Sequence, residues 1–309
     1  MFEDEESEYY VDESSRDSAG VRYGKRAEIG IFQDEVHVQG GDEAYRGTLS
    51  RETVEFGKVI GKGAFGKVVQ GYVAGNPHDV VAVKCISRRK IDEHKLQKQL
   101  ATEVTVHSNL VHPNIIGFLD FAVDNKKVYI FLEYAQYGDL LSYVSKLKPT
   151  EVEFATLLYY IGRGIEFFHN YGIVHRDIKP ENVLVDGNGI PKITDFGYCD
   201  KIGTNGYCTN ELFCGTDDYM APEIVLEKKY SYPGDIWSYG VMVFDLLVGE
   251  PPFQSDTRVE TYQKIKECAP DLTQKALRGA KYMLRSIFVK NPKMRPTMTE
   301  ILEDEWFAS

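Results

Sequence analysis

The chain of 309 residues lacks several features that define specialised classes of protein. Its five cysteines are an odd number and contain no Cys-x-x-Cys pair, which argues against a secreted disulfide framework. The opening MFEDEESEYY has neither the cationic nor the apolar region of a secretory signal. No run approaches the roughly 18 apolar residues that suggest a membrane span. A content of 43% hydrophobic and 27% charged residues is ordinary for a globular protein. From the cysteines and the missing signal and span, we expect a reducing, intracellular compartment.

A surplus of basic residues is also absent. The formal net charge is −11, and residues 1–50 contain 13 acidic and five basic residues, so residues 51–309 carry only −3. This balance gives no sign of a nucleic-acid-binding surface, and we expect neither a direct nucleic-acid partner nor a membrane. Residues 1–50 show no sustained helical or strand period, which predicts an acidic, disordered tail or a regulatory arm.

The remainder of the chain begins with strand patterns and continues with helical ones. Four segments alternate or are rich in β-branched residues, at 54–63, 67–75, 80–86 and 127–135. Residues 90–110 have helical spacing, and helical patterns dominate after about residue 139. This order predicts an α+β fold with two lobes: a small antiparallel-sheet lobe with one helix, and a larger helical lobe.

A glycine-rich segment lies between the first two predicted strands. It reads Gly61-Lys62-Gly63-Ala-Phe-Gly66-Lys-Val68, and backbone without side chains can close over nucleotide phosphates. A glycine-rich hairpin needs no ligand, so this pattern alone is weak. A dinucleotide-binding loop requires a helix after it, whereas another strand is predicted here.

Lys84 lies inside the apolar strand at 80–86. Burying its ammonium group without a partner would cost free energy, so it requires anionic neighbours such as phosphates and a carboxylate. Glu103, 19 residues later on the predicted helix, is the candidate carboxylate. The alternative is that Glu103 belongs to a solvated helix face.

The segment HRDIKPEN at residues 175–182 concentrates chemical groups. Its Asp177, Lys179 and Asn182 can address a hydroxyl, a phosphate and a metal ion. An Asp-Phe-Gly motif begins at Asp195, 13 residues after Asn182. The Asp195 carboxylate offers a second oxygen ligand for Mg²⁺. An Ala-Pro-Glu tripeptide closes the following loop. Each motif is common by chance, but this order and spacing is not.

Together these motifs resemble the signature set of eukaryotic protein kinases over residues 54–307, which implies a catalytic domain at 51–307. The resemblance implies that ATP binds between the lobes with Mg²⁺ as cofactor. In this family the lysine at Lys84 contacts phosphates and pairs with the glutamate at Glu103. The aspartate at Asp177 positions the substrate hydroxyl and accepts its proton.

Further roles follow from the same resemblance. Lys179 is expected to steady the transferring phosphoryl group, and Asn182 and Asp195 to hold Mg²⁺. Leu132 stands at the gatekeeper position before a hinge at 133–135. The implied nucleotide-binding residues are Ile60, Gly61, Lys62, Gly63, Gly66, Val68, Ala82, Lys84, Leu132, Glu133, Ala135, Asp139 and Leu184.

Several other residues resemble structural elements of the family. Thr216 is expected to bridge Asp177 and Lys179, and Asp235 to hold the backbone of the catalytic loop. Arg295 is expected to pair with the glutamate of the Ala-Pro-Glu motif. An aromatic column is expected to join the lobes, formed by His107, Phe118, His175 and Phe196.

Other motifs resemble one branch of the family. A lysine two residues after Asp177 is typical of serine/threonine kinases, and CGTDDYMAPE at 214–223 and PPF at 251–253, with a following Glu-Thr-Tyr-x-x-Ile, resemble Aurora kinases. The resemblance implies serine or threonine acceptors in protein substrates, a role in mitosis, an activating or scaffolding partner on the small lobe, and a nuclear, cytoplasmic or spindle location. Polo-like and calcium/calmodulin-dependent kinases and a pseudokinase scaffold remain alternatives.

The chain departs from Aurora kinases at its activation loop. Leu212 stands where they carry a phosphorylatable threonine, and Thr102 where they carry an arginine. We therefore expect that no loop phosphate meets Arg176 in the usual way. Thr209 or the neighbouring Glu211 could supply an anionic group instead, or a partner protein could order the loop.

The resemblance to kinases that prefer basic substrates carries one more expectation. Asp139, Glu181 and Asp245 are predicted to face the residues that precede the phosphoacceptor. Three carboxylates there would favour arginine at those positions.

Overall fold

The computed structural model describes residues 31–32, 35–36, 49–63, 66–75, 78–209, 213–227 and 229–308. Within the N-terminal region, two short strands pair in antiparallel fashion, β1 (Ile31–Phe32) and β2 (Glu35–Val36). The rest of the predicted acidic tail, up to residue 48, lies outside the described residues, so its disorder stays a prediction.

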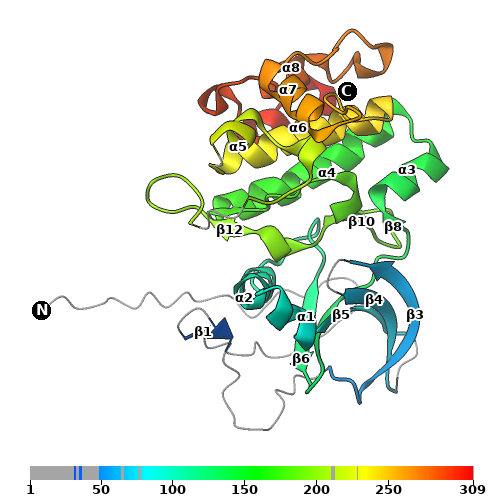
Figure 1. The fold of residues 1–309 in the computed structure, drawn as a ribbon. Helices are drawn as coiled ribbons and strands as arrows, with labels where there is room; N and C mark the ends of the chain where they lie inside the picture. Colours follow the sequence, from blue (N-terminus) through cyan, green and yellow to red (C-terminus); the bar gives the residue numbers. More distant parts are fainter. Residues whose placement is uncertain are drawn as a thin grey trace, which may run out of the picture.

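Five strands form an antiparallel sheet in the order β3-β4-β5-β7-β6 (Figure 1). They are β3 (Val54–Lys62), β4 (Gly66–Val73), β5 (Val80–Ser87), β6 (Phe118–Val123) and β7 (Lys127–Glu133). Because successive side chains point to opposite faces, Ala82 and Ile86 of β5 join one buried cluster, and Val83 and Cys85 join another. The centre of the sheet is therefore apolar on both faces, which explains the nearly continuous apolar run of β5.

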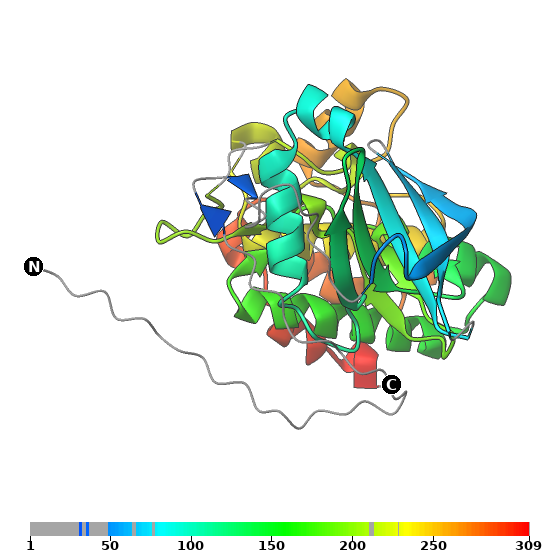
Figure 2. The same ribbon diagram turned by 90° about the horizontal axis from the view of Figure 1, so that it is seen from below.

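Two helices accompany the sheet where the sequence predicts one. They are α1 (Arg88–Glu93) and α2 (Gln97–His107), and Lys95 between them has a φ of 54°, in the left-handed region that interrupts a helix. Figure 2 shows α2 against one face of the sheet, where Val104 shares a buried cluster with Ile130 of β7. The predicted α+β, two-lobed fold is confirmed, with this second helix as a correction.

The larger lobe is mainly helical. Its helices are α3 (Leu140–Leu147), α4 (Glu151–Asn170), α5 (Pro222–Glu227), α6 (Tyr232–Val248), α7 (Arg258–Glu267), α8 (Lys281–Ile287) and α9 (Met298–Leu302). Short 3₁₀ turns occur at η1 (Pro180–Asn182), η2 (Phe196–Tyr198), η3 (Asp217–Tyr219), η4 (Lys275–Leu277), η5 (Pro292–Met294) and η6 (Glu305–Ala308). A capping box starts α4: the side chains of Thr150 and Glu153 each accept the backbone N–H of the other residue.

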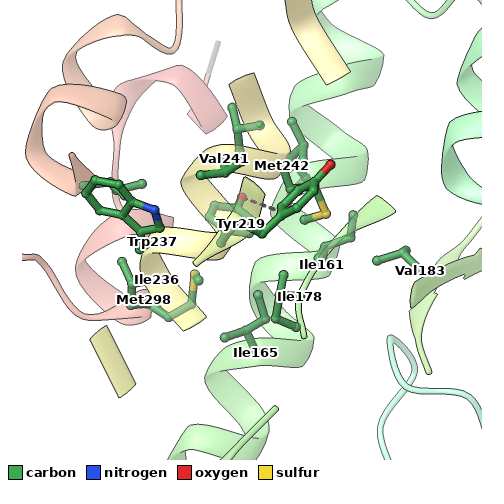
Figure 3. Packing of buried hydrophobic residues seen from close by; sticks show 14 of the residues in the cluster. Ile161, Ile165, Ile178, Val183, Tyr219, Ile236, Trp237, Val241, Met242 and Met298 are labelled. Atoms are coloured by element: carbon green, nitrogen blue, oxygen red, sulfur yellow. Dashed lines mark hydrogen bonds between the residues drawn. The ribbon is translucent and has the colours of Figure 1, made fainter. Parts of the chain in front are cut away.

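The core of this lobe surrounds α6. An unbroken stretch from Gly234 to Leu246 is buried, and a helix that is buried on every side lies at the centre of a lobe. Figure 3 shows part of the buried cluster to which Trp237, Val241 and Met242 of α6 and Ile161 and Ile165 of α4 belong. This rigid centre supports the loops that face the small lobe.

Short strands position those loops. The strands β8 (Gly138–Asp139), β10 (Val183–Val185) and β11 (Pro191–Ile193) form a three-stranded sheet in the order β11-β10-β8, and β9 (Ile173–Val174) pairs with β12 (Asp200–Lys201). Among the described residues, no helix has both the length and the apolar character needed to cross a bilayer.

Candidate active site

A cavity of about 900 Å³ lies between the two lobes. Every residue that the sequence predicts for nucleotide binding lines it, from Ile60 on β3 to Leu184 on β10. The predicted metal ligands Asn182 and Asp195 line it as well, and so does Glu103. Asp177 and Lys179 do not line it, but Asn182, which does, is hydrogen-bonded to Asp177.

Two further residues line this cavity that no sequence motif predicts. Gln99 and Leu100 of α2 lie on its wall, and no motif marks them. They lie four and three residues before Glu103, so they share its helix face, and helical periodicity alone would have identified them.

The glycine-rich loop joins β3 to β4 and forms one wall of the cavity. A Cβ atom on Gly66 would lie 2.0 Å from the carbonyl oxygen of Cys85, so only glycine allows β4 to approach β5 there. A Cβ atom on Gly63 would meet nothing within 4 Å. Gly66 is therefore required by packing, whereas Gly63 lies beside open space.

Lys84 connects the two lobes through carboxylates. Its Nζ lies 2.6 Å from Oε1 of Glu103 and 3.0 Å from Oδ1 of Asp195. Burial lowers the pKa of Lys84, but the two carboxylates raise it more, so the pKa lies above its usual range and the ammonium stays charged. The charge of Lys84 in turn lowers the pKa of Asp195. The predicted pairing of Lys84 with Glu103 is thus present.

The catalytic loop forms a second hydrogen-bonded group. Thr216 Oγ1 donates to Oδ1 of Asp177 at 2.8 Å and accepts a hydrogen bond from Lys179 Nζ at 2.6 Å. Lys179 also lies 2.9 Å from Oδ2 of Asp177, and Asn182 donates to the same oxygen at 2.8 Å. Asp177 is only 7% exposed, so this network fixes its carboxylate. The predicted bridge by Thr216 is confirmed.

Asp235 holds the backbone of the catalytic loop, as predicted. Its fully buried carboxylate accepts the backbone N–H groups of His175 at 2.8 Å and Arg176 at 2.9 Å. Burial alone would raise the pKa of Asp235, but its hydrogen bonds, including one with His169, lower the pKa below its usual range. Arg176 has a φ of 70°, so these bonds stabilise a backbone conformation that non-glycine residues rarely adopt.

In the activation segment, Arg176 and Thr209 are each bonded to other protein atoms. The buried Arg176 donates from Nε to the carbonyl oxygen of Tyr198, so protein atoms bind this guanidinium group. Thr209 Oγ1 donates to Oδ1 of the buried Asp200 at 2.8 Å. The remaining residues of that prediction, Glu211 and Leu212, lie outside the described residues.

Asp245 is also placed differently. It is buried, and it accepts a hydrogen bond from the hydroxyl of Tyr219, so the prediction that Asp245 faces substrate directly is wrong. The reason is its position on α6, the central helix of the lobe. Asp139 caps α3 by accepting hydrogen bonds from Ser142, while it also lines the cavity.

The aromatic column that joins the lobes is present. His107 of α2 lies 5.7 Å from the ring of Phe118 and 4.7 Å from that of Phe196, and Phe196 lies 5.0 Å from His175. His107 Nε2 bonds the carbonyl oxygen of Ile116 at 2.7 Å, and burial lowers the pKa of this histidine to about 4. His107 is therefore neutral at physiological pH and donates that bond.

The predicted ion pair below the activation segment is present as well. Arg295 donates to both carboxylate oxygens of Glu223 at 2.7 Å, and its guanidinium carbon lies 4.8 Å from the centre of the Trp237 ring. This bidentate geometry fixes the end of the Ala-Pro-Glu motif to the core.

Comparisons with known proteins show the family to which this chain belongs. A family profile described as "Protein kinase domain" matches residues 54–307. Aurora kinase C from Mus musculus is 33% identical over 82% of this chain and 90% of the relative. Serine/threonine-protein kinase Aurora-2 from Arabidopsis thaliana is 32% identical over 87% of this chain and 95% of the relative. Aurora kinase from Debaryomyces hansenii is 31% identical over 84% of this chain, and the match spans 63% of the relative's length. The chain therefore belongs to the protein kinase family, and within it resembles the Aurora serine/threonine kinases.

Proposed function

We propose that this serine/threonine kinase transfers the γ-phosphoryl group of ATP to protein hydroxyls preceded by basic residues. From its likeness to Aurora kinases we also propose that it acts in cell division, in the nucleus, the cytoplasm or the spindle. One observation carries the proposal: the Lys84–Glu103–Asp195 contacts and the Asp177–Lys179–Thr216 network are complete in one structure. A pseudokinase would be expected to lack part of this set.

The cavity residues suit a nucleotide and Mg²⁺. The described residues contain no cluster of three or more His, Cys, Asp or Glu side chains that could hold a metal ion. Mg²⁺ needs no such cluster, since it is commonly held by one or two protein oxygens together with phosphates and water. Asn182 and Asp195 offer hard oxygen donors, and Lys84 offers a fixed positive charge. When bound, ATP supplies the phosphoryl group and Mg²⁺ neutralises phosphate charge.

The chain's own residues would then orient the acceptor. Asp177 accepts the proton of the substrate hydroxyl, because its carboxylate is held in place by hydrogen bonds from Thr216 and Asn182. Lys179 lies beside the same carboxylate and offers positive charge to the group in transfer. Such positioning and electrostatic stabilisation account for most catalysis of phosphoryl transfer.

Activity of purified protein tests the proposal. With Mg-ATP and a serine/threonine peptide library, the wild type is expected to transfer phosphate. Lys84→Met and Asp195→Asn should each lower kcat by at least about 100-fold, because each removes a charge that positions phosphates or metal. Lys275→Met is the matched control, since Lys275 is an exposed lysine on η4. Binding of ATP without any transfer by the wild type would instead indicate a pseudokinase.

The preference for basic residues rests on a group of carboxylates around Tyr219. Burial raises the pKa of Asp245, and the nearby negative charges of Glu181, Asp218 and Glu250 raise it further. Glu181 and Glu250 are exposed, so their negative potential reaches the surface. Such a field favours arginine or lysine in a bound peptide.

The preference is measured on an arrayed peptide library. We expect arginine two or three places before the acceptor to raise kcat/KM by about tenfold, and Glu181→Gln to remove most of this gain. Glu267→Gln, an exposed change at the far end of α7, should leave the selectivity unchanged. Selection of acidic or proline-directed peptides would contradict this part of the proposal.

A further inference from the structure

The bridging residue Thr216 is itself held through its neighbour. Asp217 starts the turn η3, and the carbonyl oxygen of Thr216 accepts the N–H of Tyr219 at 3.0 Å. Because Thr216 and Asp217 share a peptide bond, a displacement of Asp217 is passed through the backbone to Thr216. What holds Asp217 therefore matters for the catalytic network.

Both oxygens of the Asp217 carboxylate are bound by side chains from the first two turns of α7. Tyr262 Oη donates to Oδ1 at 2.7 Å, and Arg258 Nε lies 2.9 Å from Oδ2. Arg258 and Tyr262 are four residues apart, so they lie on one helix face, and Arg258 Nε also lies 2.9 Å from Tyr262 Oη. The helix begins at Arg258, where Thr257 caps it by accepting the N–H of Glu260. The three side chains form a closed triangle.

A separate set of contacts anchors the same segment to the core. Ser238 Oγ donates to the carbonyl oxygen of Tyr219 at 2.8 Å, and Asp245 accepts from the Tyr219 hydroxyl. Those residues are buried, whereas the side chains of Asp217 and Arg258 are 37% and 58% exposed. The buried contacts with α6 therefore fix the fold of the segment. The contacts with α7 can be removed without opening the core.

We propose that Tyr262 and Arg258 are positioning residues, which through Asp217 hold Thr216 in its bonds with Asp177 and Lys179. This inference rests on the proposed function, since it concerns the same phosphoryl transfer. Loss of the triangle lets Thr216 move, so Asp177 and Lys179 spend less time in the aligned arrangement. The rate of transfer falls while the nucleotide cavity, which contains none of these residues, is unaffected.

Steady-state kinetics with a serine peptide test the inference. Tyr262→Phe keeps the ring and removes the hydroxyl, and we expect kcat to fall about three- to tenfold, the size expected for loss of one ordinary, partly exposed hydrogen bond. The KM for ATP and the melting temperature should stay as in the wild type. Tyr282→Phe on α8, where the side chain is 75% exposed, is the matched control. Asp217→Asn, which keeps an acceptor for Tyr262, should retain more activity than Asp217→Ala.

A double-mutant comparison separates positioning from a general structural role. The Thr216→Val variant already lacks the hydroxyl that bonds Asp177 and Lys179. Adding Tyr262→Phe to this variant should therefore lower kcat no further. Additive losses, or an unchanged kcat in Tyr262→Phe, would overturn the inference while leaving the proposed function in place. A wild type that phosphorylates no serine or threonine peptide would overturn both.

Discussion

At the residue scale, Gly66 carries a sharp steric requirement. Its missing Cβ leaves room for the Cys85 carbonyl of the neighbouring strand. We expect Gly66→Ala to destabilise the protein by about 1–3 kcal/mol, because β4 must move away from β5. Nucleotide affinity should fall as well, since both strands line the cavity.

Gly63, three residues before Gly66 in the same loop, provides the control. Gly63→Ala adds the same methyl group where no atom lies within 4 Å, so its stability should stay within about 0.5 kcal/mol of the wild type. Urea unfolding and binding of a fluorescent nucleotide measure both quantities. Equal destabilisation by the two variants would show that the close approach at Gly66 is not what requires glycine.

Residues with a motif were the ones that the sequence could predict. Lys84, Asp177 and Asp195 each belong to a short pattern whose spacing reflects the chemistry of a phosphate site. The partner of Arg176 and the burial of Asp245 could not be predicted in this way. Both depend on which distant backbone or side chain the fold brings near, and no local spacing records that.

At the scale of elements, the activation segment is tied to the catalytic loop by its own atoms. The pairing of β12 with β9 lies next to the Arg176–Tyr198 bond, and Thr209 is bonded to Asp200. A phosphate on Thr209 would lie beside the Asp200 carboxylate and be repelled by it. We therefore expect that phosphorylation of Thr209 does not order this segment.

Activity assays of variants test this account. We expect Thr209→Glu to lower kcat about two- to fivefold through repulsion from Asp200, and phosphatase treatment of the wild type to leave kcat unchanged. Thr204→Glu, an exposed position of the same loop, should have little effect. If phosphatase silenced the enzyme and Thr209→Glu restored it, Thr209 would be a switch, and the Thr209–Asp200 bond would not hold the active state.

The strands β3, β4, β5 and β7 were predictable from their regular patterns, and β6 shows why another strand of the same sheet was missed. The register of β6 against β7 shifts between Phe118 and Asp120, and this bulge interrupts strict alternation. Asp120 further obscures the pattern, since its carboxylate accepts the N–H groups of Leu49 and Phe121. An aspartate inside a strand gives the sequence a pattern that is typical of a turn.

At the scale of the whole molecule, His107 of the aromatic column makes the stability of the fold depend on pH. The pKa of His107 is about 4 in the folded protein and 6.5 when unperturbed, so the unfolded chain binds more protons between these values. The contribution of His107 to the free energy of unfolding is therefore complete above pH 6.5 and falls as the pH drops toward 4. The loss from this residue should be about 3 kcal/mol at most.

Urea unfolding as a function of pH measures this effect. His107→Phe keeps an aromatic ring against Phe118 and Phe196 but cannot titrate, so its stability should fall less steeply between pH 6.5 and 4. Half-buried His112, whose pKa is also lowered mainly by burial, supplies a remaining slope of the same sign. A variant with the full wild-type pH dependence would place the titrating group elsewhere.

The tryptophan beneath Arg295 gives the molecule a natural optical reporter. The chain has two tryptophans, Trp237 and Trp306, and both lie buried in the helical lobe. Their emission follows the packing of that lobe, while the sheet lobe contributes none. Circular dichroism of the amides registers both lobes. Melting curves from the two signals that coincide would mean that the lobes unfold together, and an earlier dichroic transition would reveal a sheet lobe that opens first.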